Sequence, residues 1–129
     1  MTALPAGASA TEQILANHPE WKLHVLVVWE PILPTDWRPP SGSTLGRISD
    51  LRAQQFWDPQ HEVAKALSRI EQPDSGEKFH WDEALLYAPH SEWKEAPQPL
   101  FWQGPVYKVV AGLEAAVRNV WCCQSRRPA

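Results

Sequence analysis

The run KLHVLVVW at residues 22–29 constrains the fold strongly, because apolar and β-branched residues occupy consecutive positions. Consecutive apolar residues predict a strand that is buried on both faces, and such strands lie inside sheets that helices cover on each side. The run leads directly into EPILPTDWRPP at 30–40, a loop stiffened by four Pro residues. We therefore expect one domain of the α/β class, with a long loop after its first strand.

Three helices are predicted from capping residues and from apolar positions spaced by three and four. They cover residues 9–17, 59–72 and 107–121. Ser9 and Glu12 have the spacing of a capping box at the start of the first helix. Asp58 provides the N-cap acceptor of the second helix. One turn of helix is also expected after Ser43.

Two more strands are predicted in the second half of the chain. DEALLYA at 82–88 has the apolar character of a buried strand, and LFWQG at 100–104 forms a shorter strand. RAQQFWD at 52–58 fits either a short strand or a helical turn, and both alternatives stay open. The predicted order of elements is helix, strand, helix, strand, strand, helix.

Composition and charge exclude several classes of protein. With 129 residues, of which 43% are hydrophobic and 21% charged, the chain has the makeup of one ordinary globular domain. The net charge of −3, with no basic cluster before the C-terminal tail, argues against nucleic acid or an anionic membrane as a partner. No apolar run approaches the roughly 20 residues that a membrane span needs.

The first residues, MTALPAGASATEQ, have neither the basic region nor the long apolar stretch of a secretory signal. A cytoplasmic location is therefore expected for the chain as written, with a periplasmic or secreted location as the alternative if the N-terminus is truncated. The domain is expected over 9–121, between a flexible N-terminus at 1–8 and a flexible tail at 122–129.

Three phrases of the sequence resemble a group of thioredoxin-like proteins whose function is poorly defined. They are VVWEPILPTDW, FWDP and WDEALLYAPHSEW. The resemblance covers about 7–121, and the predicted element order agrees with six of the seven elements of the thioredoxin core, β-α-β-α-β-β-α. The resemblance implies a thioredoxin-like fold, and it implies descent from proteins that exchange thiols and disulfides through a CxxC pair before the first helix.

This sequence departs from the family at the positions that carry its chemistry. Residues 1–6 contain no thiol where the CxxC pair belongs, and eight residues are too few for the first core strand. No Pro stands before 82–88, where the family has a cis-Pro facing the thiols. We therefore expect no dithiol exchange and no catalysis. Either the chain is part of a longer CxxC protein, or it is a minimal variant with a binding or structural role.

A candidate site lies at the loop after strand 22–29, because open α/β sheets bind ligands at the carboxyl ends of their strands. The candidate residues are Glu30, Asp36, Trp37, Arg38 and Asp82. Two acids can divide acid and base roles when burial separates their pKa values. The structural alternative is that Asp36 caps a turn and Glu30 pairs with an Arg. Asp82 stands at the entry of strand 82–88, at the place of the family's cis-Pro.

Cys122 and Cys123 are the two cysteines of the chain, and they are adjacent. Adjacent thiols can bind soft metals such as Hg(II), Cu(I) or As(III), which makes a thiol redox or soft-metal protein the alternative function. The structural alternative is that one Cys packs beside Trp121 and the other lies in a frayed end of the helix. No motif indicates a cofactor, and none is predicted.

Two kinds of protein partner are predicted. Without the first core strand, strands 22–29 and 82–88 keep open edges, which favours pairing between two copies of the chain. The Trp- and Pro-rich loops offer a second possibility, an interaction module that docks a different protein.

Overall fold

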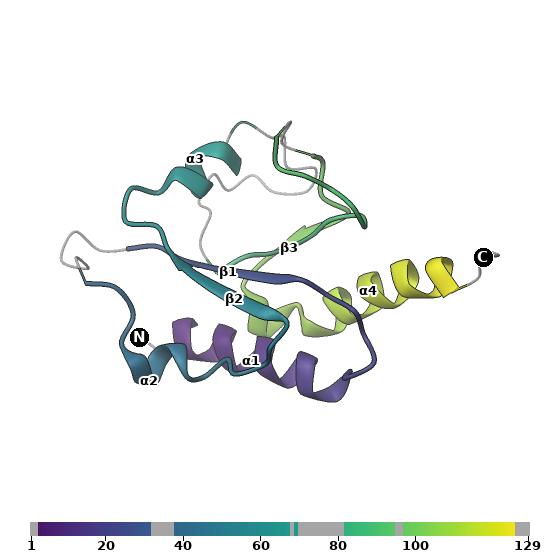
Figure 1. Ribbon diagram of the computed structural model, residues 1–129, viewed down its shortest axis with the longest axis horizontal. Coiled ribbons are helices and arrows are strands. Elements are labelled where there is room, and N and C mark those ends of the chain that lie inside the picture. The colour runs from purple at the N-terminus through teal and green to yellow at the C-terminus, as the bar shows by residue number, and fades with distance from the viewer. Residues whose placement is uncertain (1–2, 32–37, 68, 70–81, 95–96, 126–129) are drawn as a thin grey trace.

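A computed structural model describes residues 3–31, 38–67, 69, 82–94 and 97–125, with side chains described between 7 and 122 (Figure 1). Its elements are α1 (Ala3–Asn17), β1 (Val25–Trp29), α2 (Gly42–Leu45), β2 (Ala53–Trp57), α3 (Glu62–Leu67), β3 (Ala84–Leu86), β4 (Phe101–Gln103), the 3₁₀ helix η1 (Val106–Lys108) and α4 (Val110–Ser125). Figure 1 shows α1, α2 and α4 on one side of the strands and α3 on the other. The prediction of a single mixed α/β domain is confirmed.

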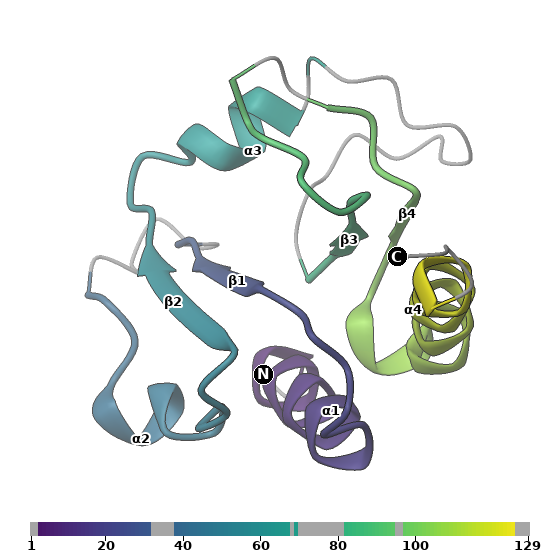
Figure 2. The same cartoon turned by 45° about the vertical axis from the view of Figure 1, so that its right-hand side comes forward.

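The described strands form two separate two-stranded sheets. β1 and β2 are parallel, with a register that runs from Val25 opposite Ala53 to Trp29 opposite Trp57. β3 and β4 are antiparallel, with Leu85 opposite Trp102. Figure 2 shows the strands in the order β2, β1, β3, β4 across the molecule. The segment 52–58, for which a strand or a helical turn was predicted, therefore contains a strand.

The first predicted strand is shorter and less buried than its sequence indicates. β1 begins at Val25 rather than at residue 22, and its burial alternates along the strand. Leu26 is 59% exposed, and Phe56 on the neighbouring strand is 50% exposed. The prediction of burial on both faces is wrong, because alternation of this kind arises when only one face of a sheet is covered.

The first helix begins at Ala3, six residues before its predicted start. Ser9 therefore lies inside α1 and is exposed, so the predicted capping box does not form. The Glu12 carboxylate instead accepts hydrogen bonds from the backbone N–H groups of Ser49 and Asp50, at 3.2 and 3.4 Å. Pro5 is tolerated because it stands in the first turn, where its missing N–H is not needed.

The other helices also differ in extent from the predictions. α3 begins at Glu62, so Pro59 precedes it, yet Asp58 still accepts the N–H groups of Glu62 and Val63, at 3.1 and 2.9 Å. Residues 68 and 70–72 of this predicted helix lie outside the described residues. The last predicted helix is divided into η1 and α4, and α4 extends to Ser125. β3 and β4 are shorter than predicted.

A cluster of buried hydrophobic residues joins the α1 region to α4. It consists of Ile14 in α1, Trp21 after the end of α1 and Val117 in α4. The ring of His18 stacks on Trp21 at 3.7 Å between centroids, and His18 Nε2 lies 2.6 Å from Glu114 Oε2 of α4. These contacts hold the segment after the carboxyl end of α1 against α4.

Arg52, one residue before β2, binds the carboxyl end of α1. Its Nη1 donates to the carbonyl oxygens of His18 and Trp21 at 2.9 and 2.6 Å, and its Nη2 donates to that of Leu15 at 2.7 Å. Asp50 pairs with the same guanidinium through both carboxylate oxygens. Because the last carbonyls of a helix have no partner within the helix, one side chain here satisfies several of them.

Candidate functional site

The clearest group of interacting polar side chains lies where β1 and β2 end. Glu30 directly follows β1 and Asp58 directly follows β2, and Trp29 and Trp57 are register partners. The N–H of Asp58 donates to the carbonyl oxygen of Trp29 at 2.8 Å, which fixes the two strand ends together. This edge is where parallel α/β sheets place their ligand sites.

His61 completes this group. Its Nδ1 lies 3.2 Å from Glu30 Oε2, and the N–H of Ala64 donates to Glu30 Oε1 at 3.3 Å. Glu30 is 15% exposed and His61 is 43% exposed, so the imidazole reaches solvent beside a partly buried carboxylate. We call Glu30, Asp58 and His61 the strand-end cluster.

The two carboxyl groups of the cluster differ in their pKa values. Burial raises the pKa of Glu30, and a hydrogen bond with Asp58 raises it further against the opposing effects of His61 and Ala64. Burial also pushes the pKa of Asp58 upward, but the N–H groups of Val63 and Glu62 outweigh burial and lower it. Asp58 is therefore the ionised member of the pair, and Glu30 is the member that takes up a proton first.

The backbone at His61 adopts a positive φ of 56°. A residue with a Cβ pays about 1 kcal/mol or more for this left-handed conformation, so the surrounding contacts must hold it. Those contacts are the ones just described: Glu30 binds the ring, and the carbonyl oxygen of His61 accepts the N–H of Lys65 at 2.9 Å.

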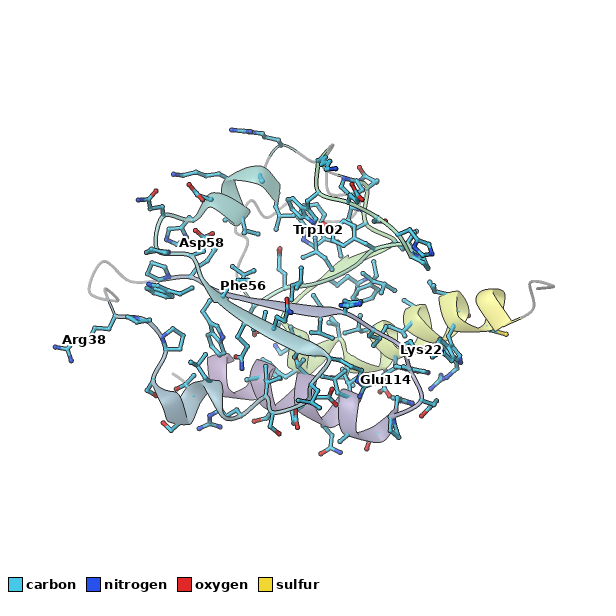
Figure 3. The ribbon with its side chains drawn as sticks, viewed as in Figure 1. Lys22, Arg38, Phe56, Asp58, Trp102 and Glu114 are labelled. Carbon is cyan, nitrogen blue, oxygen red and sulfur yellow. The ribbon has the colours of Figure 1, made fainter. Side chains whose placement is uncertain are left out.

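Of the loop residues predicted as a site, one belongs to the cluster. This residue is Glu30, and its partner is His61 rather than the predicted Arg. Asp36 and Trp37 lie outside the described residues. Arg38 is exposed, and Figure 3 shows it projecting outward, away from Asp58. The indole N–H of Trp29 donates to Gln55 Oε1 at 2.9 Å.

Sequence reasoning missed Asp58 and His61 as site residues. Asp58 was predicted only as the N-cap acceptor of the second helix, and His61 was given no role. The sequence does hold one indication that Asp58 belongs with Glu30, because each residue directly follows a strand. This indication requires that 52–58 is assigned as a strand parallel to β1.

Asp82, the other predicted site residue, lies apart from the strand-end cluster in a second environment. A methyl group built on Gly7 of α1 would come 2.5 Å from Asp82 Oδ1, so the carboxyl group lies directly against the helix. Asp82 Oδ2 is buried and has no hydrogen-bond partner among the described residues. Burial raises its pKa to about 6. Its φ is 53°, and its carbonyl oxygen accepts the N–H of Val106 at 3.0 Å.

The cysteines lie on another part of the molecule. Cys122 is exposed near the end of α4, and the side chain of Cys123 lies outside the described residues. Within the described part of the chain, no group of three or more His, Cys, Asp or Glu residues is arranged to hold a metal ion. The strand-end cluster is no exception, because the Asp58 oxygens already accept backbone N–H groups.

Comparisons with protein-family models, with curated proteins and with solved structures gave no match to this chain. Among the described helices, none has the length and apolar character needed to cross a bilayer.

Proposed function

We propose that the chain is a thioredoxin-like domain that does not exchange disulfides and that binds an extended segment of another protein chain along β1. A second copy of the same chain is the partner we propose. The observation that carries this proposal is the edge of β1 to which no described strand is hydrogen-bonded. The element order supports a thioredoxin-like arrangement, since the β3–β4 hairpin and α4 follow the earlier helices and strands.

The hydrogen-bonding groups of β1 divide between its two edges. In a parallel ladder, alternate residues direct both N–H and C=O toward the partner strand. Val25 directs its backbone at β2, because its N–H donates to the carbonyl oxygen of Arg52 at 3.0 Å, and Trp29 does so through its carbonyl oxygen, which accepts the N–H of Asp58 at 2.8 Å. Leu26 and Val28 therefore direct their backbone groups away from β2, toward the side on which Figure 2 places β3, and among the described strands none is hydrogen-bonded to this edge.

The side chains beside this edge are apolar and exposed. Leu26, Val28 and Phe56 lie on one face of the β1–β2 pair, with Val28 directly opposite Phe56. Proteins usually protect open strand edges with charged residues or Pro, because an unprotected edge pairs with strands of other chains. Backbone pairing along the edge together with apolar contact on the face is the combination that strand addition uses.

The environment of Asp82 supports the absence of disulfide exchange. In the family that the sequence resembles, a thiol pair at the start of the first core helix faces a cis-Pro. Here the group that lies against Gly7 of α1 is a carboxyl group, and both cysteines stand beyond residue 121. A thiol in the last turns of α4 has no helix N-terminus to activate it.

Replacing Leu26 by Lys tests the strand-pairing proposal. The Leu26 side chain is already exposed, so Lys leaves the fold intact while placing a charge at the open edge. We expect light scattering to give a concentration-dependent dimer for the unmodified chain and a monomer for Leu26→Lys, with dimerisation weakened at least about tenfold.

Gln54→Lys is the matched control, since Gln54 is exposed on β2 directly opposite Leu26. This variant adds the same charge to the same face but not to the open edge, and it should retain most of the dimerisation. A monomeric unmodified chain at all concentrations would remove the second copy as partner. Equal loss in both variants would show that the edge is not the determinant.

The thiols give an independent test of the redox part of the proposal. We expect no reduction of insulin disulfides by the chain and slow, ordinary reaction of its thiols with a disulfide reagent. Rapid reaction that disappears in Cys122→Ser, or tight Hg(II) binding lost in the same variant, would instead support the alternative of a thiol redox or soft-metal protein.

A further inference from the structure

The four histidines that the structure describes differ in two properties that decide imidazole reactivity. His18 has a carboxylate partner, Glu114, but its side chain is only 17% exposed. His24 and His90 are exposed, and no contact with a carboxylate is found for them among the described residues. His61 combines a carboxylate partner with exposure. His90 also has a positive φ, of 65°, so it matches His61 in backbone conformation and differs from it in the carboxylate.

The Glu30 carboxylate fixes which ring nitrogen of His61 is available. A carboxylate oxygen accepts hydrogen bonds, so Nδ1 carries the hydrogen that points at Glu30 Oε2, and the lone pair is left on Nε2. Glu30 is itself held by the N–H of Ala64, so the ring has a supported orientation. A base whose other nitrogen is bound by an oriented carboxylate is the arrangement that activates imidazoles in catalytic sites.

We propose that His61 is a nucleophilic imidazole that accepts an acyl group from small neutral acyl donors, such as activated esters. Glu30 is its positioning residue. This inference does not depend on the proposed binding of an extended segment, because the strand-end cluster and the open edge of β1 use different atoms.

The chemical step balances within the cluster and the ester. The lone pair of Nε2 forms a bond to the acyl carbon, and the bond from that carbon to the leaving oxygen breaks with its electron pair. The Nδ1 hydrogen passes to Glu30 Oε2 and from there to the leaving oxygen, which departs as the alcohol and leaves a neutral acyl-imidazole. Water then adds to the acyl carbon, the bond from that carbon to Nε2 breaks, and the free acid departs while one hydrogen of the water returns to the imidazole. The net reaction is ester hydrolysis.

The charges around the cluster favour neutral donors. The carboxylate of Asp58 lies beside Glu30, and Glu62 follows His61 directly at the start of α3. An anionic acyl donor would approach these carboxylates against repulsion, whereas a neutral ester would not. A cationic acyl-imidazolium formed during the step would be stabilised by the same groups.

The test compares the histidines within one unmodified protein. Diethyl pyrocarbonate acylates accessible imidazoles, and peptide mapping gives the rate at each one. We expect His61 to be acylated about tenfold faster than His90, because only His61 has the oriented carboxylate. Equal rates at His61 and His90 would overturn the proposal, and no folding difference between variants enters this comparison.

Two variants separate positioning from structural support. In Glu30→Gln the amide oxygen can accept a hydrogen bond from Nδ1 but cannot accept its proton. The acylation rate at His61 should therefore fall to the rate at His90, and the two rates should depend on pH in the same way. Hydrolysis of p-nitrophenyl acetate should fall severalfold in His61→Gln and remain unchanged in His90→Gln. A preserved rate advantage in Glu30→Gln, or equal hydrolysis by both His variants, would contradict the assignment. Leu26→Lys should leave every one of these rates unchanged.

Discussion

Arg52→Ala is expected to lower the free energy of unfolding by about 3 kcal/mol. The guanidinium donates to three carbonyl oxygens at the carboxyl end of α1, those of Leu15, His18 and Trp21. Its loss leaves these acceptors without a charged donor and leaves Asp50 without its partner. Because hydrogen bonds to charged groups contribute more than neutral ones, the effect should exceed that of most single substitutions.

Urea denaturation followed by tryptophan fluorescence measures this difference. Arg69→Ala is the control, since Arg69 is exposed and should change stability by less than about 0.5 kcal/mol. Arg52→Lys should recover only part of the loss, because one ammonium cannot reach three carbonyls in the geometry of a planar guanidinium. A loss below 1 kcal/mol in Arg52→Ala would show that water replaces the guanidinium at these carbonyls.

Asp82→Asn is expected to raise the free energy of unfolding at pH 7 by about 2 kcal/mol, after allowance for the remaining solvent contact of the carboxyl group. Burial against α1 raises the pKa of Asp82 to about 6 from an ordinary value of 3.8. Between these pH values the folded chain binds more protons than the unfolded chain. Its stability therefore falls as pH rises from about 4 to about 6, and the penalty stays constant above that range.

The measurement is the free energy of unfolding at several pH values between 4 and 8. In Asp82→Asn the fall assigned to this carboxyl group should disappear, so the two curves should meet near pH 4 and separate above it. Asn also tolerates the positive φ of this position, so the backbone is not disturbed. Glu92→Gln, at an exposed carboxylate, should leave the slope unchanged. Parallel curves for Asp82→Asn would contradict the burial of its charge.

The elements could be predicted from local sequence because capping and periodicity act within a few residues. Their extents could not, because contacts distant in sequence decide them. Glu12 shows this for α1: its spacing from Ser9 indicates a cap, but its carboxylate binds Ser49 and Asp50, 37 and 38 residues away. Gln54 and Gln55 made the segment at 52–58 ambiguous, and pairing with β1 settles it as a strand.

The predicted site residues and the strand-end cluster share one described member, Glu30. Glu30 could be found because it follows an obvious strand. His61 could not be found in this way, because its position depends on the parallel register of β1 and β2. It also depends on a left-handed backbone conformation that none of the residue types at 61–65 requires. Asp82 was recognised from the family resemblance, whereas its burial against Gly7 depends on how α1 packs.

The contact between His18 and Glu114 has a consequence for synthesis of the chain. The two residues are 96 positions apart, and Trp21 beside His18 shares its buried cluster with Val117 of α4. Contacts this far apart in sequence cannot form until the later segment has left the ribosome. During translation the part of α1 that packs on α4 therefore stays uncovered until α4 emerges.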